Sequence, residues 1–369
     1  MNGGRAISKA QYVYTEEESA ARFSAVLSEV NRTIEALSII LAIKADIRFA
    51  VVASLTPYQV VHLGDGTFVV LIDQRAFYML LTLCFRVQSL PPFSDRFGFV
   101  TVECQRSYQG KFLLDIVKDF VFHTEDLSPY LSAARSFLVS QAAITYIVGH
   151  EIAHVSHGHL DFKASEDFAQ FATSLEDKNL TMRTLEMDAD SSATTSVIDI
   201  FERHIHWCLS SAELSGEGSP GDICRAAREQ YVAGMFMALL CMDAFSANFA
   251  PAAYPISYAR FLTTSGVTQI ALSRPERDAG GIPESVRLLL VSVFERLSGG
   301  ISTLGHPIAA NVAIFEGDTD VPRCEYSPLG IATGQQELAP LHRRWARIRP
   351  FLERYQRGGR LAPAQAEPL

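Results

Sequence analysis

The sequence predicts an α+β fold that is mostly helical and carries a small sheet in its first third. Short stretches rich in β-branched residues alternate with turn residues between positions 47 and 104. Beyond residue 109 nearly every segment has the apolar spacing of a helix. The length of 369 residues allows about two domains, or one domain with a large appendage.

Composition and charge exclude several function classes. Lys and Arg number 32 against 41 Asp and Glu, and the net charge of −9 argues against nucleic acid as a partner. The six cysteines are scattered, without the spacing of a metal site or a disulfide framework, which favours reduced thiols. The N-terminus lacks a signal-peptide pattern, and the apolar stretches 77–85 and 231–242 fall well short of the ~20 residues that cross a bilayer. We therefore expect a cytoplasmic protein without stable membrane insertion.

The first 127 residues are predicted to form an N-terminal helix and a small sheet that pack on the remainder of the chain. Apolar residues recur at helical intervals early in this region, and Gly64, Asp65 and Gly66 predict the turn of a hairpin. The predicted helices are 15–42 and 76–87, and the predicted strands are 47–54, 58–62, 67–72 and 97–104.

Residues 128–355 are predicted to form a helical domain, and residues 356–369 a disordered tail rich in Gly, Ala and Pro. The stretches 215–222 and 273–283 concentrate Gly, Pro and charge and predict connectors. The predicted helices after the sheet are 111–122, 128–157, 166–174, 184–209, 226–249, 283–297 and 340–355.

The most informative motif is His150-Glu151-Ile-Ala-His154, an HExxH pattern. On a helix the two histidines lie one turn apart on the same face, so both imidazoles can reach one metal ion. Glu151 lies beside them and can accept a proton from a water that the metal acidifies. The alternative is a buried helix whose histidines are unrelated.

A catalytic zinc site takes three protein ligands, so a third must exist. The longer pattern HExxHxxGxxH fails because His157 and Leu160 occupy its Gly and His positions. Glu186, 32 positions after His154, supplies a carboxylate on a later helix, and Asp190 falls one turn after it, where it can accept the free N–H of a ligand imidazole. We expect Asp188 to be solvated. An exposed acidic helix face is the alternative for Glu186 and Asp190.

The stretch from 140 to about 197, with the helix after it, resembles the gluzincin metallopeptidases. It is similar to the HtpX and CAAX-prenyl-protease group, which pairs HExxH with a downstream Glu-x-x-x-Asp, and to the Lit-type phage-exclusion peptidases. The absence of membrane spans favours the Lit-type branch. The resemblance implies a zincin-like metallopeptidase domain with the sheet upstream of the active-site helix, Zn2+ as cofactor, and a protein or peptide substrate.

The resemblance also implies two substrate-binding residues and a biological role. The HtpX group has a His-Pro pair followed by Arg, and here Tyr254, Pro255 and Arg260 keep that spacing with Tyr in place of His. Tyr254 would then stabilise the oxyanion and Arg260 would anchor the site, unless they form a packed turn. His306 is a second candidate for the oxyanion. A Lit-type peptidase would serve anti-phage defence and respond to a protein or phage-derived activator.

Two further histidines lie close to the HExxH motif. His157 and His159 fall at the expected end of the active-site helix, where helix capping is the expected role.

We predict a zinc-dependent endopeptidase. The rivals are a non-catalytic zinc scaffold or sensor, which His157 or His159 would close as a fourth ligand, and a hydrolase of small non-peptide substrates.

Overall fold

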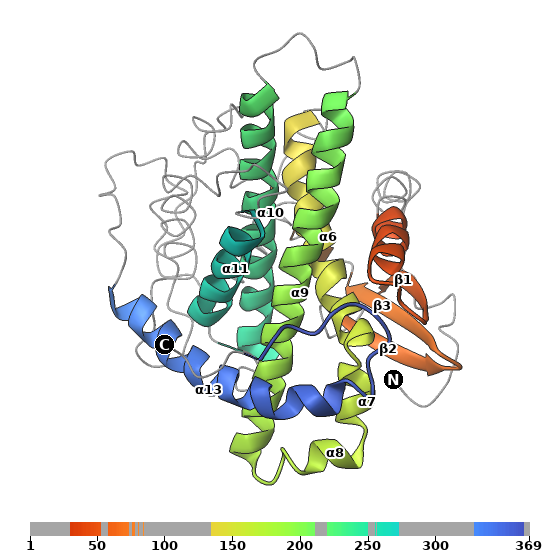
Figure 1. The fold of residues 1–369 in the computed structure, drawn as a ribbon, viewed down its shortest axis with the longest axis vertical. Helices are drawn as coiled ribbons and strands as arrows, with labels where there is room; N and C mark the ends of the chain where they lie inside the picture. The colour runs from red at the N-terminus through yellow and green to blue at the C-terminus, as the bar shows by residue number, and fades with distance from the viewer. Residues whose placement is uncertain are drawn as a thin grey trace.

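The computed structural model describes residues 30–52, 58–73, 134–210, 220–249, 257–272 and 328–364, with positions 76, 77, 80, 84 and 255 between them. It confirms an α+β fold that is mostly helical, with a small sheet before the long helices (Figure 1). The strands are β1 (Asp46–Val52), β2 (Tyr58–Gly64) and β3 (Thr67–Asp73). The helices are α6 (Ala134–Ser156), α7 (His159–Lys163), α8 (Glu166–Ala169), α9 (Leu175–Ser210), α10 (Pro220–Phe249), α11 (Ser257–Leu272) and α13 (Pro328–Leu352).

The three described strands pair in the order β1-β3-β2. The predicted hairpin is confirmed, because β2 and β3 are antiparallel and Asp65 and Gly66 form their turn with φ of 51° and 74°. β1 runs parallel to β3. The central strand β3 is buried along almost its whole length, which fits its run of β-branched and aromatic residues. This leaves β2 at one edge of the described sheet, beside α6.

Helices α6, α9 and α10 lie side by side and form the centre of the molecule (Figure 1). Small residues allow close approach: a Cβ added at Gly149 of α6 would lie 3.5 Å from the Cα of Ala193 in α9. One hydrophobic core joins these helices to β2, β3 and the helix before β1. No helix in the described segments is long and apolar enough to cross a membrane.

Several helices differ from the prediction: α10 begins at Pro220 rather than 226, and α8 ends at Ala169 rather than 174. α9 starts at Leu175 rather than 184, and the hydroxyl of Ser174 accepts the backbone N–H of Asp177 at its start. α11 was not predicted, because its Thr and Gly residues have low helix propensity; burial of Thr264 and Thr268 overrides that propensity. α13 runs through Pro340, a residue that normally ends a helix. The predicted elements 97–104, 111–122 and 283–297 lie outside the described residues.

The disordered tail predicted for 356–369 is wrong for residues 356–364, which form an ordered strap after α13. The backbone N–H of Arg357 donates to the carbonyl of Ser156 over 2.8 Å, and its side chain donates to Asp161 over 2.8 Å. Leu361 is buried with Trp345 in a second hydrophobic cluster. Composition could not predict this strap, because its order comes from backbone partners at the end of α6.

Replacing Gly234 by Ala is expected to lower the free energy of unfolding by about 1–3 kcal/mol, the usual effect of overpacking a core. The new Cβ would lie 2.3 Å from the carbonyl oxygen of Val139, so α10 and α6 would have to separate. Gly266→Ala in α11 is the matched control, since a Cβ there meets nothing within 4 Å. Urea unfolding measures both. Equal stability of the two variants would contradict the close approach of α10 and α6.

Candidate metal centre

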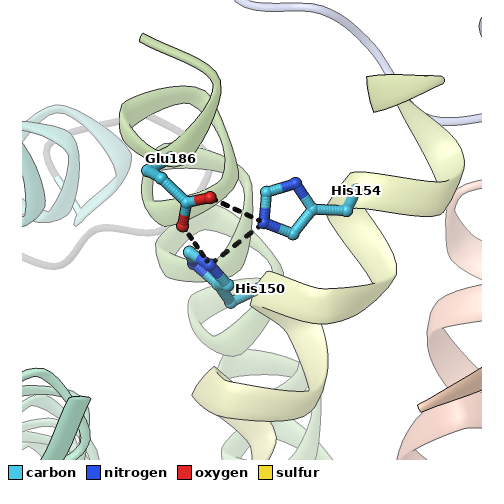
Figure 2. Close-up of side chains that lie close together, drawn as sticks. All are labelled: His150, His154 and Glu186. Carbon is cyan, nitrogen blue, oxygen red and sulfur yellow. Dashed lines mark hydrogen bonds and ion pairs between the residues drawn. The ribbon is translucent and has the colours of Figure 1, made fainter. Parts of the chain in front are cut away.

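Three predicted ligands converge at the contact between α6 and α9. His150 and His154 lie one turn apart on α6, and Glu186 faces them from α9 (Figure 2). The Nε2 atom of His150 is 3.1 Å from Glu186 Oε2 and 3.2 Å from the Nε2 atom of His154. His154 Nε2 is 3.6 Å from Glu186 Oε1. All three residues are buried, with at most 6% exposed.

The separations of these atoms fit a metal ion. Tetrahedral zinc with bonds of 2.0–2.1 Å holds its ligand atoms about 3.3 Å apart. The three observed separations of 3.1, 3.2 and 3.6 Å bracket that value. The Nε2 atoms of His150 and His154 face each other in this buried site. They can form a hydrogen bond only when exactly one of them carries a proton, whereas both can bind a metal ion when neither does. The residues therefore fit a metal with nitrogen and oxygen ligands.

The electrostatics of the three residues favour an ionised carboxylate between two rings. Burial alone would raise the pKa of Glu186, but the rings of His154 and His150 outweigh it and hold the pKa well below its usual value. Burial alone would lower the pKa of His150, but its hydrogen bonds to Asp190 and Glu186 raise it to about 10. Burial lowers the pKa of His154. The Glu186 carboxylate is thus ready to bind a cation at neutral pH.

Glu151 follows the first histidine and is itself buried, with 5% exposed. Burial raises the pKa of its carboxyl group to about 7, and the nearby His150 ring opposes that rise. The backbone N–H of Val60, in strand β2, hydrogen-bonds the same carboxylate. A carboxyl group with a pKa near neutral can both take up and release a proton at physiological pH.

Asp190 lies behind His150, at the position predicted for it. Its Oδ1 atom is 2.9 Å from His150 Nδ1, and the hydroxyl of Tyr146 donates to the same oxygen over 3.2 Å. Arg260 donates two hydrogen bonds to Asp190, of 2.8 and 2.7 Å, and both side chains are fully buried. The structure therefore places Arg260 against Asp190, the residue that contacts the Nδ1 atom of His150. Tyr254 and His306 lie outside the described residues.

A second group of side chains, which the sequence did not predict, lies next to the first. His157, His159 and Asp188 are all buried and could by composition hold a metal ion. The expected solvation of Asp188 is therefore wrong, since its Oδ2 atom lies 2.5 Å from His157 Nδ1 and 3.1 Å from His159 Nε2. Gly158, with φ of 75°, turns the chain between the two histidines. The only sequence signal was the occurrence of two more histidines so close to the motif.

The fold and the buried residues define a helical α+β protein whose His-His-Glu group can hold a metal ion. Comparison with protein-family models gives a match: residues 130–275, about two fifths of the chain, match the model of Peptidase U49, the Lit-type protease family. The matched region contains His150, His154, Glu186 and Arg260. It supports a peptidase, a hydrolase of protein substrates. Neither the curated proteins nor the solved structures contain a significant match.

Proposed function

We propose that the protein is a zinc-dependent endopeptidase in which His150, His154 and Glu186 hold the metal. The observation that carries this proposal is the buried His-His-Glu group at metal-ligand separations, with the buried Glu151 directly after its first histidine. The match to a peptidase family over the same helices supports it. Zinc fits the donor set better than magnesium or calcium, which prefer oxygen ligands alone.

Glu151 acts as the general base of the proposed reaction. When bound, zinc supplies Lewis acidity, which acidifies water and polarises a carbonyl group. The Glu151 carboxylate takes the proton of the attacking water and transfers it to the leaving amine, and its raised pKa suits both transfers. Asp190 holds the ring of His150 by accepting from its Nδ1, and Arg260 holds Asp190. Arg260 thus serves as a positioning residue, and Tyr254 stays the proposed donor to the oxyanion.

Strand β2 is the proposed guide for an extended substrate. It lies at one edge of the described sheet and runs beside α6. The hydrogen bond from the backbone N–H of Val60 to Glu151 places this strand directly against the proposed base. A peptide that adds to a strand edge is held by main-chain hydrogen bonds, which suits cleavage of unfolded or exposed segments. The Lit-type resemblance further suggests anti-phage defence with a protein or phage-derived activator as the trigger.

The wild-type protein is expected to contain about one zinc ion per chain, and chelation is expected to remove both the ion and the cleavage of proteins in a bacterial lysate. Added zinc should restore both. The control is Glu186→Gln, which keeps the shape of the side chain but loses the anionic oxygen and should contain little zinc. Elemental analysis and mass spectrometry of new protein termini measure the two effects. Metal-free wild-type protein with full cleavage activity would contradict the proposal.

A further inference from the structure

The three residues His157, His159 and Asp188, called here the outer histidine cluster, contact the proposed metal site at one point. His157 follows α6, His159 begins α7, and Asp188 comes from α9 two residues after Glu186. The Nδ1 atom of His159 lies 2.9 Å from the Nδ1 atom of His154. Every side chain of the cluster is at most 2% exposed, so solvent does not compete for these hydrogen bonds.

The contact between His154 and His159 can hold only one proton. Two neutral imidazoles whose Nδ1 atoms face each other form a hydrogen bond when one ring donates and the other accepts. His154 directs Nε2 at Glu186 and His150, so that nitrogen must be unprotonated to bind a metal. Its proton is then on Nδ1 and is donated to His159. The remaining proton of His159 is consequently on Nε2, which lies 3.1 Å from Asp188 Oδ2.

We propose that His159 and Asp188 are positioning residues that fix His154 in the tautomer required for metal binding. The proposal rests on the proposed function, because it assigns a role toward the same metal. Asp188 accepts from His159 Nε2, His159 accepts from His154 Nδ1, and His154 presents a bare Nε2 to the ion. His150 has a matching support in Asp190. Each histidine ligand thus has its own buried acceptor, a carboxylate for one and an imidazole for the other.

A metal ion in the outer histidine cluster itself is the competing assignment. Its residue types suit an ion, and within the described residues Asp188 Oδ1 is buried without a hydrogen-bond partner. However, His157 Nδ1 and His159 Nε2 both lie within hydrogen-bond distance of the same oxygen, Asp188 Oδ2, and two N–H donors to one carboxylate oxygen satisfy that arrangement without an ion. An ion on His159 Nε2 would also move that ring's proton to Nδ1 and leave His154 unable to bind the inner ion.

Two amide substitutions of His159 separate the roles of its two nitrogens. The side-chain amide of Asn reaches the position of Nδ1, so His159→Asn keeps an acceptor for His154 and loses the contact with Asp188. The amide of Gln reaches the position of Nε2, so His159→Gln keeps the contact with Asp188 and loses the acceptor. We expect His159→Gln to weaken zinc binding by about 10–100-fold, the usual effect of losing such a partner, and His159→Asn to weaken it by clearly less.

The measurement is a zinc titration of each full-length protein against a competing chelator, with thermal unfolding of the metal-free forms as the control. A purely structural role would lower the unfolding temperature and the zinc affinity of both variants alike, and that result would overturn the proposal. Unchanged affinity in His159→Gln would also overturn it while leaving the proposed function intact. Wild-type protein that binds no zinc would overturn the proposed function itself.

The tautomers can be read directly in the wild type, which needs no variant to fold. Nitrogen NMR of histidine-labelled, zinc-loaded protein is expected to show the proton of His154 on Nδ1 and that of His159 on Nε2. A proton on His159 Nδ1, or two zinc ions bound per chain, would favour an ion in the outer histidine cluster and overturn the positioning role.

Discussion

Glu151→Gln is expected to abolish proteolysis and leave the zinc content unchanged. The substitution removes the only proton acceptor that we place beside the reacting water. It leaves the three proposed metal ligands unchanged. Loss of general base catalysis costs about 10²–10⁴-fold in rate, which would bring cleavage near the limit of detection. Gln has the volume of Glu and can still accept from the backbone N–H of Val60, so the contact between α6 and β2 is expected to persist.

The measurement compares new protein termini, by mass spectrometry, in a bacterial lysate treated with each protein, together with metal content. Glu176→Gln is the matched control, because this glutamate is exposed at the start of α9 and should change neither quantity. Cleavage by Glu151→Gln at the wild-type rate would show that another group is the base. Zinc in both proteins with cleavage in neither would favour a zinc scaffold, or an enzyme that waits for its activator.

The wild-type rate is expected to fall with decreasing pH through a region near pH 7. Burial raises the pKa of Glu151 to about 7, so the carboxyl group is protonated below that pH and cannot accept a proton from water. A glutamate with its ordinary pKa of about 4.3 would stay ionised, and would keep the enzyme active, well below pH 6. Because the pKa of Glu151 is raised, the loss of activity is expected at a higher pH. A rate that stays constant down to pH 5 would show that the pKa of Glu151 in the zinc-loaded enzyme lies well below 7.

The inner site could be predicted from sequence because helical periodicity fixes which side chains share a face. The four-residue spacings of His150 with His154, and of Glu186 with Asp190, each place two residues one turn apart. What the sequence could not supply is how the two helices face each other. The contact of Gly149 with Ala193 brings α6 and α9 close enough for Glu186 to meet the histidines, and this is a tertiary effect.

The outer histidine cluster escaped prediction for a different physical reason. Asp188 lies between Glu186 and Asp190 on the same helix and points to another side, which in an isolated helix is solvent. The chain fills that side because it turns back at Gly158 and brings His157 and His159 to Asp188. Only glycine fits at position 158, since a Cβ there would lie 2.3 Å from the carbonyl oxygen of Tyr355, the residue just before the strap. The local spacing of residues along one helix carries no information on a chain that turns back against it from elsewhere in the sequence.

Arg260→Met is expected to cause the largest loss of stability among single substitutions near the site. Arg260 and Asp190 are both fully buried, and their hydrogen bonds of 2.8 and 2.7 Å neutralise the carboxylate. Removing one partner of such a buried pair costs about 3–5 kcal/mol, because the remaining buried carboxylate loses its cationic partner. The matched control is Arg48→Met, which breaks an exposed pair with Asp46 and should cost at most about 1 kcal/mol.

The double variant Arg260→Met with Asp190→Leu separates stability from metal binding. With both charges gone, apolar side chains of similar volume fill the space, and such replacements of buried pairs are often neutral. We expect urea unfolding of the metal-free double variant to recover most of the stability lost by Arg260→Met alone. Zinc affinity should stay reduced by about 10–100-fold, because His150 Nδ1 has lost its acceptor. If affinity recovered together with stability, Asp190 would act only in packing, and the positioning role of the Arg260 and Asp190 pair would be wrong.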